Sequence, residues 1–152
     1  SKKIELFQNH LMLFFTGFSR IASEIACDQI KAIPQKKTEL KLMYQMVEEA
    51  INILSNSRNS LDSFGKLLNE SWKIKRSLTS RISTSEIDEI YKIAIKTGAL
   101  GGKLLGAGGG GFILFFVRPE QQNKVREKLK KLLYVPFKFE DLGSQIVYYK
   151  PS

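Results

Sequence analysis

The chain has 152 residues, of which 43% are hydrophobic and 26% charged, a balance typical of a soluble globular domain that can bury a core. It carries 24 Lys and Arg against 15 Asp and Glu, and this net charge of +9 favours anionic partners such as phosphates. The single cysteine excludes an internal disulfide and a cysteine-built metal site, and the single histidine has no partner for a zinc site.

The sequence also bears on location and on macromolecular partners. The N-terminal residues show no apolar signal core behind their charges, so the cytoplasm is the expected location. No apolar run is long enough to cross a bilayer, so no membrane partner is expected. The cations are spread over several predicted helices, without the aromatic and basic alternation of RNA-binding sheets, so nucleic acid is not expected either.

The first half of the sequence predicts one strand and then a series of helices. A continuous apolar run over residues 10–15 ends at a Thr-Gly pair and predicts a buried strand. Helices are predicted over residues 20–31, with Ser19 as the N-cap, over 38–54 and over 60–78.

The two longer helices carry apolar residues at helical spacing, which we expect to face the core. These residues are Leu40, Met43, Tyr44, Val47, Ala50, Ile51 and Leu54 in the first helix and Leu61, Phe64, Leu67, Leu68 and Trp72 in the second. Ser83 and Glu86 have the spacing of a capping box and predict the start of another helix, which ends at Gly98 as a left-handed C-cap.

The C-terminal part predicts the remaining elements. An apolar strand over residues 112–117 is followed by a helix that Pro119 opens, with four apolar residues inward: Val125, Leu129, Leu132 and Leu133. Two further strands are predicted over 137–139 and 145–149. The sequence therefore predicts a single α+β domain over residues 1–152, with a mostly antiparallel four-stranded sheet and helices packed on one face.

A cluster of glycines precedes the strand over 112–117. Most glycines of the chain lie between Gly98 and Gly111, and the last four of these residues are consecutive. Ordering a glycine costs more conformational entropy than ordering other residues, so such a run is typical of places where backbone approaches a ligand or other backbone closely. Successive amides in such a turn form an anion site. A tight connection into a crowded strand, without a ligand, is the alternative, and the size of the cluster favours a functional loop.

Three familiar phosphate motifs do not fit this loop. A P-loop needs a glycine where Thr97 stands and a Ser or Thr where Leu104 stands. The spacing Gly106-x-Gly108-x-x-Gly111 matches the dinucleotide fingerprint, but that fingerprint follows a strand and opens a helix, whereas this loop follows a helix and opens a strand. The protein-kinase glycine loop requires His-Arg-Asp and Asp-Phe-Gly motifs, which the sequence lacks.

The remaining pattern is a helix, then the run Gly-Gly-Lys-Leu-Leu-Gly-Ala-Gly-Gly-Gly-Gly-Phe, then an apolar strand. It resembles the third conserved motif of the GHMP sugar kinases, named for galactokinase, homoserine, mevalonate and phosphomevalonate kinases. Residues 14–20, 68–76, 98–116 and 135–148 also resemble the branch of that family that acts on heptose phosphates. The resemblance thus covers nearly the whole chain from about residue 10 onward.

The resemblance implies transfer of phosphate from ATP, with Mg²⁺, to the anomeric O1 of D-glycero-D-manno-heptose 7-phosphate, for nucleotide-activated heptose and surface-glycan synthesis. The family keeps its ATP-phosphate loop, with Gly-Leu-Gly-Ser-Ser, and its acidic catalytic residue in an N-terminal domain, and this sequence contains no such loop. We therefore expect the chain to need a partner N-terminal kinase domain, to be inactive alone and to self-associate in isolation, with no catalytic residue and no metal ligand of its own.

The resemblance also implies site residues. The phosphate loop would comprise Lys103, Gly106, Ala107, Gly108, Gly109, Gly110 and Gly111, and the substrate-binding residues would be Thr16, Gly17, Arg20, Trp72, Lys73 and Arg76. Arg20 stands at a helix start, where it could bind the sugar 7-phosphate. Lys103 and Arg20 are also consistent with solvated surface cations, and Trp72 with a core residue. A stand-alone domain that binds a small ligand without catalysis remains the alternative function.

Overall fold

The computed structural model describes residues 2–18, 21–56, 60–140 and 142–150. Its strands form one sheet in the order β2-β3-β1-β4, and each pairing is antiparallel. These strands are β1 (Leu11–Phe15), β2 (Ala99–Leu104), β3 (Phe112–Val117) and β4 (Leu133–Tyr134). The predicted α+β class with a four-stranded antiparallel sheet is therefore confirmed.

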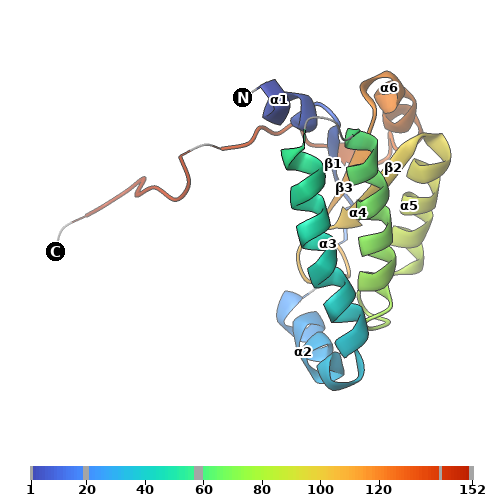
Figure 1. Cartoon of the computed structure of the whole chain (residues 1–152), viewed down its shortest axis with the longest axis vertical. Coiled ribbons are helices and arrows are strands. Elements are labelled where there is room, and N and C mark those ends of the chain that lie inside the picture. The colour runs from blue at the N-terminus through green and yellow to red at the C-terminus, as the bar shows by residue number, and fades with distance from the viewer. Residues whose placement is uncertain (1, 19–20, 57–59, 141, 151–152) are drawn as a thin grey trace.

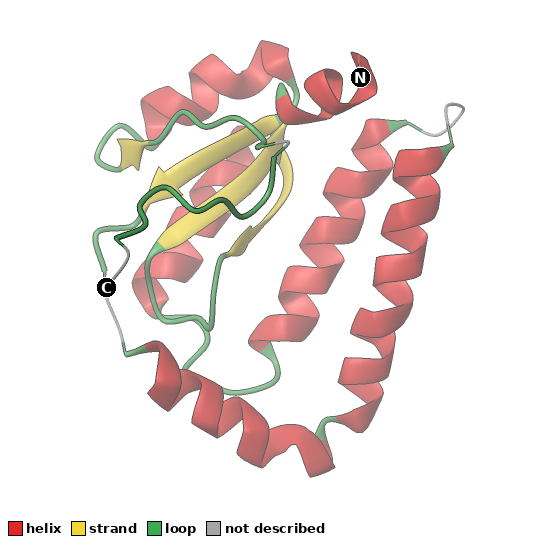
Figure 2. Ribbon diagram, turned by 90° about the vertical axis from the view of Figure 1, so that its left-hand side faces the viewer, coloured by secondary structure: helices red, strands yellow, loops and turns green. Residues whose placement is uncertain are grey.

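Helices precede, separate and flank the strands. They are α1 (Lys2–Gln8), α2 (Ala22–Ala32), the short 3₁₀-helix η1 (Ile33–Gln35), α3 (Lys37–Ser55), α4 (Leu61–Arg76), α5 (Ser85–Thr97) and α6 (Pro119–Lys128). Helices α3 and α4 lie side by side, and α2 lies at the end of the molecule opposite to α1 (Figure 1). Figure 2 shows α3 and α4 together beside one edge of the sheet.

The core lies between the sheet and helices α5 and α6. Successive residues of a strand point to opposite faces, so Ile113, Phe115 and Val117 share one face of β3. They are fully buried together with Met12 and Phe14 of β1, and the same cluster includes residues of α5 and α6: Ile87, Tyr91, Ala94 and Val125. Each such side chain contributes about 1.5–3 kcal/mol by its burial, so this layer positions the sheet and the loop between β2 and β3.

Helix α4 packs very closely on β2. A β-carbon built at Gly101 would lie 2.0 Å from the carbonyl oxygen of Gly65 and 2.7 Å from the amide nitrogen of Asn69, both on α4. A β-carbon at Gly65 would lie 2.7 Å from the ring of Phe116. The two glycines therefore let the helix backbone approach the strand backbone at a distance that side chains would prevent.

This contact explains a strand that the sequence pattern did not predict. Residues 99–104 contain two adjacent glycines, which are depleted in strands, so the sequence pattern predicts a continuation of the glycine loop there. In the structure it is β2, an edge strand paired with β3, and Lys103 therefore lies in a strand rather than in a loop. Gly101 allows the close approach of α4, and a β-carbon at Gly102 would lie 2.5 Å from the ring of Phe115 on β3.

The two strands predicted near the C-terminus were wrong. Residues 137–139 and the described residues 142–150 have no regular structure, and Figure 1 shows the chain leading away from the domain. The fourth strand is instead the two-residue β4, which pairs with Phe14 and Phe15 of β1. Strand propensity alone does not form a strand without a neighbour to pair with, and the described chain offers residues 145–149 no such neighbour.

Three details of the helices also differ from the predictions. Thr84, not Ser83, is the N-cap of α5, and its hydroxyl accepts a hydrogen bond from the amide of Ile87. Leu133 lies in β4 and is exposed instead of extending the inward face of α6. The stripe of α3 is only partly buried: Leu40 and Met43 pack against the core, whereas Tyr44 is 67% and Ile51 60% exposed. The cap predicted at Ser19 lies outside the described residues, and α2 begins at Ala22.

One ion pair predicts a pH dependence of stability. Both carboxylate oxygens of Asp62 on α4 accept hydrogen bonds from the guanidinium of Arg118, and this contact lowers the pKa of Asp62 below its ordinary value of 3.8. A carboxyl whose pKa is lowered by folding stabilises the native state above pH 3.8 and loses that contribution as the pH falls through the lowered value. Thermal unfolding of wild type and Asp62→Asn between pH 2 and 7 should show a stability difference at neutral pH that disappears in acid; a constant difference would contradict this.

Candidate functional site

Residues 105–111 form the glycine loop, which connects β2 to β3. The amide of Gly109 donates to the carbonyl of Ile82 at 2.9 Å, and the amide of Gly111 donates to the carbonyl of Phe18 at 2.8 Å. The carbonyl of Gly111 in turn accepts from the amide of Thr16 at 2.8 Å and from its hydroxyl at 2.9 Å. The second half of the loop is thus held by the segments that follow β1 and precede α5.

Two glycines of the loop fill positions that no other residue would occupy without movement. Gly108 has φ +124°, and a β-carbon there would lie 2.8 Å from the Cα and the carbonyl oxygen of Ile82. A β-carbon at Gly110 would lie 2.5 Å from the carbonyl oxygen of Phe18. Both obstacles are backbone atoms, which cannot rotate away. The glycine run is therefore required for the loop to lie against residues 16–18 and the segment before α5.

Thr16 has a clear structural part in this arrangement. It is buried, and its hydroxyl donates to Gly111 and accepts from the amide of Phe18 at 3.4 Å. The structure thus places Thr16 and the adjacent Gly17 beside the loop, with the Thr16 hydroxyl engaged inside the domain. Thr16 is one of the residues predicted to bind the substrate, and in the structure its hydroxyl supports the glycine loop.

Thr16→Val should lower the free energy of unfolding by about 1 kcal/mol, because it removes a buried hydroxyl that bridges two segments while keeping the side-chain shape. Urea unfolding measures the change. Thr38→Val is the matched control, since Thr38 is exposed on α3 and should change stability by less than about 0.5 kcal/mol. Equal effects at the two positions would contradict the assigned role of Thr16.

The first half of the loop is open and lies beside cations. Gly106 is exposed, and its carbonyl accepts a hydrogen bond from the ammonium of Lys75 at 2.8 Å. Burial lowers the pKa of Lys75, and the charge of Lys103 lowers it further, so the two lysines lie close enough to repel each other. A half-buried ammonium that contacts a neutral carbonyl and faces a second lysine is suited to receive an anion.

Two residues beside the loop were not predicted from the sequence. Lys75 lies one position before Arg76 on α4, and Gln29 of α2 donates to the carbonyl of Ala107 at 2.7 Å. No residue spacing in the sequence indicates either contact, because Gln29 and Lys75 belong to helices that are distant from the loop in sequence. The one sequence signal for Lys75 is that it lies on the same turn of α4 as Lys73 and Arg76.

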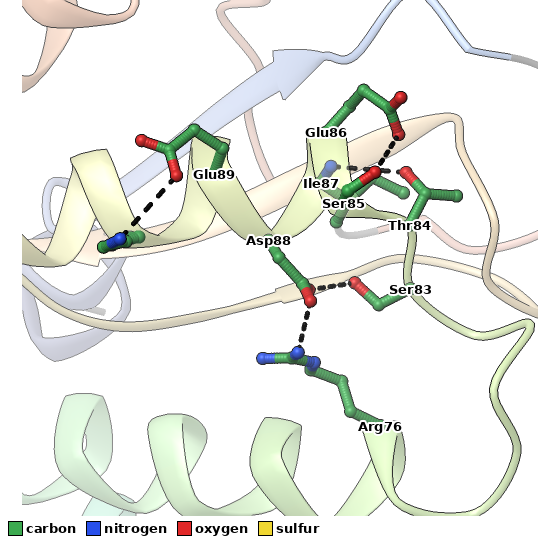
Figure 3. A network of polar contacts seen from close by, with 9 residues as sticks. Arg76, Ser83, Thr84, Ser85, Glu86, Ile87, Asp88 and Glu89 are labelled. Carbon is green, nitrogen blue, oxygen red and sulfur yellow. Dashed lines mark hydrogen bonds and ion pairs between the residues drawn. The ribbon is translucent and has the colours of Figure 1, made fainter.

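Lys73 and Arg76 line a second feature, an open depression of about 400 Å³ between the C-terminal end of α4 and the N-terminal end of α5. We call it the serine pocket, and its lining residues are Lys73, Arg76, Ser77, Thr79, Ser80, Ser83 and Asp88. Figure 3 shows Arg76 pointing from α4 towards Asp88 on α5, with Ser83 on the same carboxylate. The structure therefore brings Lys73 and Arg76, two of the three cations predicted to bind substrate, into one polar depression, where Lys73 pairs with Glu70 and Arg76 with Asp88.

Trp72 must be removed from the predicted substrate contacts. Its side chain is 1% exposed and packs against Tyr91, with ring centroids 6.1 Å apart. An indole that is covered on both faces cannot stack on a sugar ring, so the core interpretation of this residue holds. The predicted contact of Arg20 lies outside the described residues.

The described residues also bear on metal ions and membranes. No three His, Cys, Asp or Glu side chains in the described ranges are placed to hold a metal ion together. No helix within those ranges is both long and apolar enough to cross a membrane.

Comparison with known proteins gives one family match and several relatives. Residues 46–135 match the family model described as "GHMP kinases C terminal". A D-glycero-alpha-D-manno-heptose 7-phosphate kinase of Campylobacter jejuni is 32% identical over 121 residues, which cover 79% of this chain and 35% of that protein. An L-fucokinase/L-fucose-1-P guanylyltransferase of Bacteroides fragilis is 31% identical over 124 residues, 80% of this chain and 13% of that protein.

A solved structure gives the same picture for the fold. The mevalonate kinase of Methanococcus jannaschii superposes with a TM-score of 0.73 at 25% sequence identity, covering 89% of this chain and 41% of that one. The chain thus spans about a third of the heptose-phosphate kinase and two fifths of the mevalonate kinase.

Proposed function

This chain belongs to the GHMP kinase family, whose C-terminal domain it matches, and from that premise we propose that it is the substrate-side half of an ATP-dependent sugar kinase. The glycine loop is the observation that carries this proposal. It combines a backbone approach that only glycine permits with an open turn beside Lys75. In phosphoryl transfer the protein mainly positions the reactants and neutralises developing charge, and those are the tasks such a loop can perform.

We propose a division of work within the loop. Gly109 and Gly111 use their amides to hold the loop in place, so they contribute rigidity rather than direct phosphate contacts. The exposed turn at Gly106, with Lys75 and Lys103 near it, would line the phosphates of ATP, because the lysines supply positive charge to a polyanion. ATP supplies the transferred phosphoryl group, and these residues keep it in place and offset its charge.

The remaining parts of the reaction are proposed to lie in an N-terminal ATP-binding domain. That domain would supply the nucleotide loop and the acidic catalytic residue. Magnesium, which the family implies, would also be held there, because no three His, Cys, Asp or Glu side chains among the described residues are placed to hold a metal ion. The exposed apolar residues of α3, Tyr44, Val47 and Ile51, form a surface that the isolated chain would bury by self-association.

We propose D-glycero-D-manno-heptose 7-phosphate as the substrate, phosphorylated at O1 in the cytoplasm for nucleotide-activated heptose and surface-glycan synthesis. The heptose-phosphate kinase relative supports this choice, and Lys73 and Arg76 provide the cations that a sugar phosphate requires. The fucokinase relative is nearly as similar in sequence, so family membership by itself leaves the sugar open.

The test joins the chain to an ATP-binding half. The C-terminal segment of the Campylobacter heptose-phosphate kinase is replaced by this chain, and ATP-dependent phosphorylation of heptose 7-phosphate is measured for the joined protein and for the chain alone. We expect turnover only in the joined protein. Turnover by the chain alone would overturn the proposed division. Tight binding of a sugar phosphate to a chain that stays inactive when joined would support a stand-alone binding domain.

A further inference from the structure

Helix α2 lies at the end of the molecule opposite to α1 and is incompletely packed against its neighbours (Figure 1). Of its residues, all of which the structure describes, only Ile25 is buried. A partly open cavity of about 290 Å³ lies between α2, η1 and α3, lined by Gln29 and by apolar side chains that include Ile30 and Leu40. Because close packing is what normally fixes a helix in a domain, the polar contacts of α2 have a large share in fixing its position.

One of these polar contacts is made directly with the glycine loop. The half-buried side chain of Gln29 donates from its Nε2 atom to the carbonyl of Ala107 at 2.7 Å. Ala107 lies between the exposed turn at Gly106 and the position of Gly108, which packs against the backbone of Ile82. The Gln29 bond therefore holds the loop at the junction of its open half and its packed half.

A second contact holds α2 itself. Arg81 donates to Glu24 at 2.8 Å and to Asp28 at 2.9 Å, and these two carboxylates lie one turn apart on the same face of α2. Arg81 directly precedes Ile82, whose carbonyl accepts from the amide of Gly109 at 2.9 Å. Ion pairs as exposed as these add little to stability, so their effect is on where α2 lies.

We infer that Gln29 and Arg81 are positioning residues of the glycine loop: Arg81 holds α2 in place, and Gln29 on α2 holds the Ala107 carbonyl. Both act through the backbone of the loop rather than through contact with a reactant. The inference rests on the proposed function for the reaction that the loop serves. Because phosphoryl transfer depends on the placement of the groups around the phosphates, loss of these contacts lowers kcat rather than raising KM.

The test is Gln29→Met in the joined enzyme, in which this chain completes the Campylobacter kinase. Methionine keeps the length and helix propensity of glutamine and suits a cavity lined by apolar side chains, but it has no donor for the Ala107 carbonyl. We expect kcat to fall about tenfold and the KM for the sugar phosphate to stay within about twofold of wild type. A kcat within about twofold of wild type would overturn the inference.

Gln122→Met is the matched control. Gln122 of α6 donates to the carbonyl of Asn9, also at 2.7 Å, beside the end of β3 that is farther from the loop. The two variants lose the same kind of bond, so their thermal unfolding temperatures should be similar, whereas only Gln29→Met should lower kcat. An equal fall of kcat in both variants would show a general structural effect and would overturn the inference.

Arg81→Gln tests the part played by α2. It removes both ion pairs and should lower kcat about threefold, whereas Arg118→Gln, which removes the pair with Asp62, should leave kcat unchanged. Since Arg81 and Gln29 act through the same helix, the double variant should lose less than the product of the two single losses. A loss equal to that product would contradict coupling through α2.

Hydrogen exchange of the Gly109 amide in this chain separates the inference from the proposed function, because it requires no turnover. Exchange should be about threefold faster or more in Gln29→Met than in wild type or Gln122→Met. If the joined enzyme is inactive, the kinase proposal fails, and faster exchange still supports the hold of Gln29 on the loop whereas unchanged exchange refutes it. An active joined enzyme whose kcat is indifferent to Gln29→Met would refute the inference and leave the kinase proposal standing.

Discussion

Gly101→Ala is expected to lower the free energy of unfolding of the chain by more than about 3 kcal/mol, which is above the range of most single substitutions. The β-carbon would lie 2.0 Å from the carbonyl oxygen of Gly65, and this backbone atom belongs to a helix that cannot yield locally. Helix α4 would have to move away from β2, which would open the contact between the two elements. Urea unfolding followed by circular dichroism measures the loss.

Gly65→Ala is the matched control on the other side of the same contact. Its β-carbon would meet the ring of Phe116 at 2.7 Å and the β-carbon of Leu100 at 2.8 Å, both of which are side-chain atoms. The Phe116 ring can rotate, whereas the β-carbon of Leu100 is fixed to its backbone, so Gly65→Ala should also be destabilising; it should be less so than Gly101→Ala because neither approach is as short as 2.0 Å. If Gly101→Ala unfolded at the same urea concentration as wild type, the close approach of α4 to β2 would be refuted.

Gly108→Ala is expected to reduce the kcat of the joined enzyme about 100-fold while the domain remains folded. The substitution places a methyl group 2.8 Å from the backbone of Ile82 at φ +124°, so the loop must move away from the segment that positions it. A displacement of about 1 Å near a phosphoryl group is sufficient for a loss of this size. The measurements are kcat for heptose phosphate and the circular dichroism spectrum of the same preparation.

Gly143→Ala controls for backbone strain. Gly143 also has a positive φ, +66°, but no atom lies within 4 Å of a β-carbon built there, and the residue is in the C-terminal segment. It should leave kcat within twofold of wild type, since the domain contacts that hold the loop are untouched. Full activity in Gly108→Ala would mean that the position of the loop does not matter for transfer.

Much of this fold and of its loop could be predicted from the sequence. The apolar runs of β1 and β3 and the periodicity of α5 specify elements whose packing agrees with their local pattern. The glycine run was predictable as a special loop, because no regular element tolerates four consecutive glycines cheaply. The other two strands were harder to predict, because β2 contains two glycines that close packing requires and that strands normally lack, and because β4 is only two residues long.

The parts of the site that the sequence did not predict depend on contacts between distant segments. Asp88 stands among acidic residues at a helix start, and only the folded chain brings Arg76 to it. Lys75 reaches Gly106 across 31 positions of the sequence, so no spacing could indicate it. For Trp72 the family resemblance implied a substrate contact, and tertiary packing buries the side chain instead.

The central claim is that this chain completes a kinase acting on the anomeric hydroxyl of heptose 7-phosphate. The most direct measurement is phosphorus NMR of the product that the joined enzyme forms from ATP and D-glycero-D-manno-heptose 7-phosphate. We predict a second phosphate resonance coupled to the anomeric proton, with the 7-phosphate retained and no product from L-fucose at the same enzyme concentration. A product phosphorylated elsewhere, or turnover of L-fucose alone, would contradict the claim.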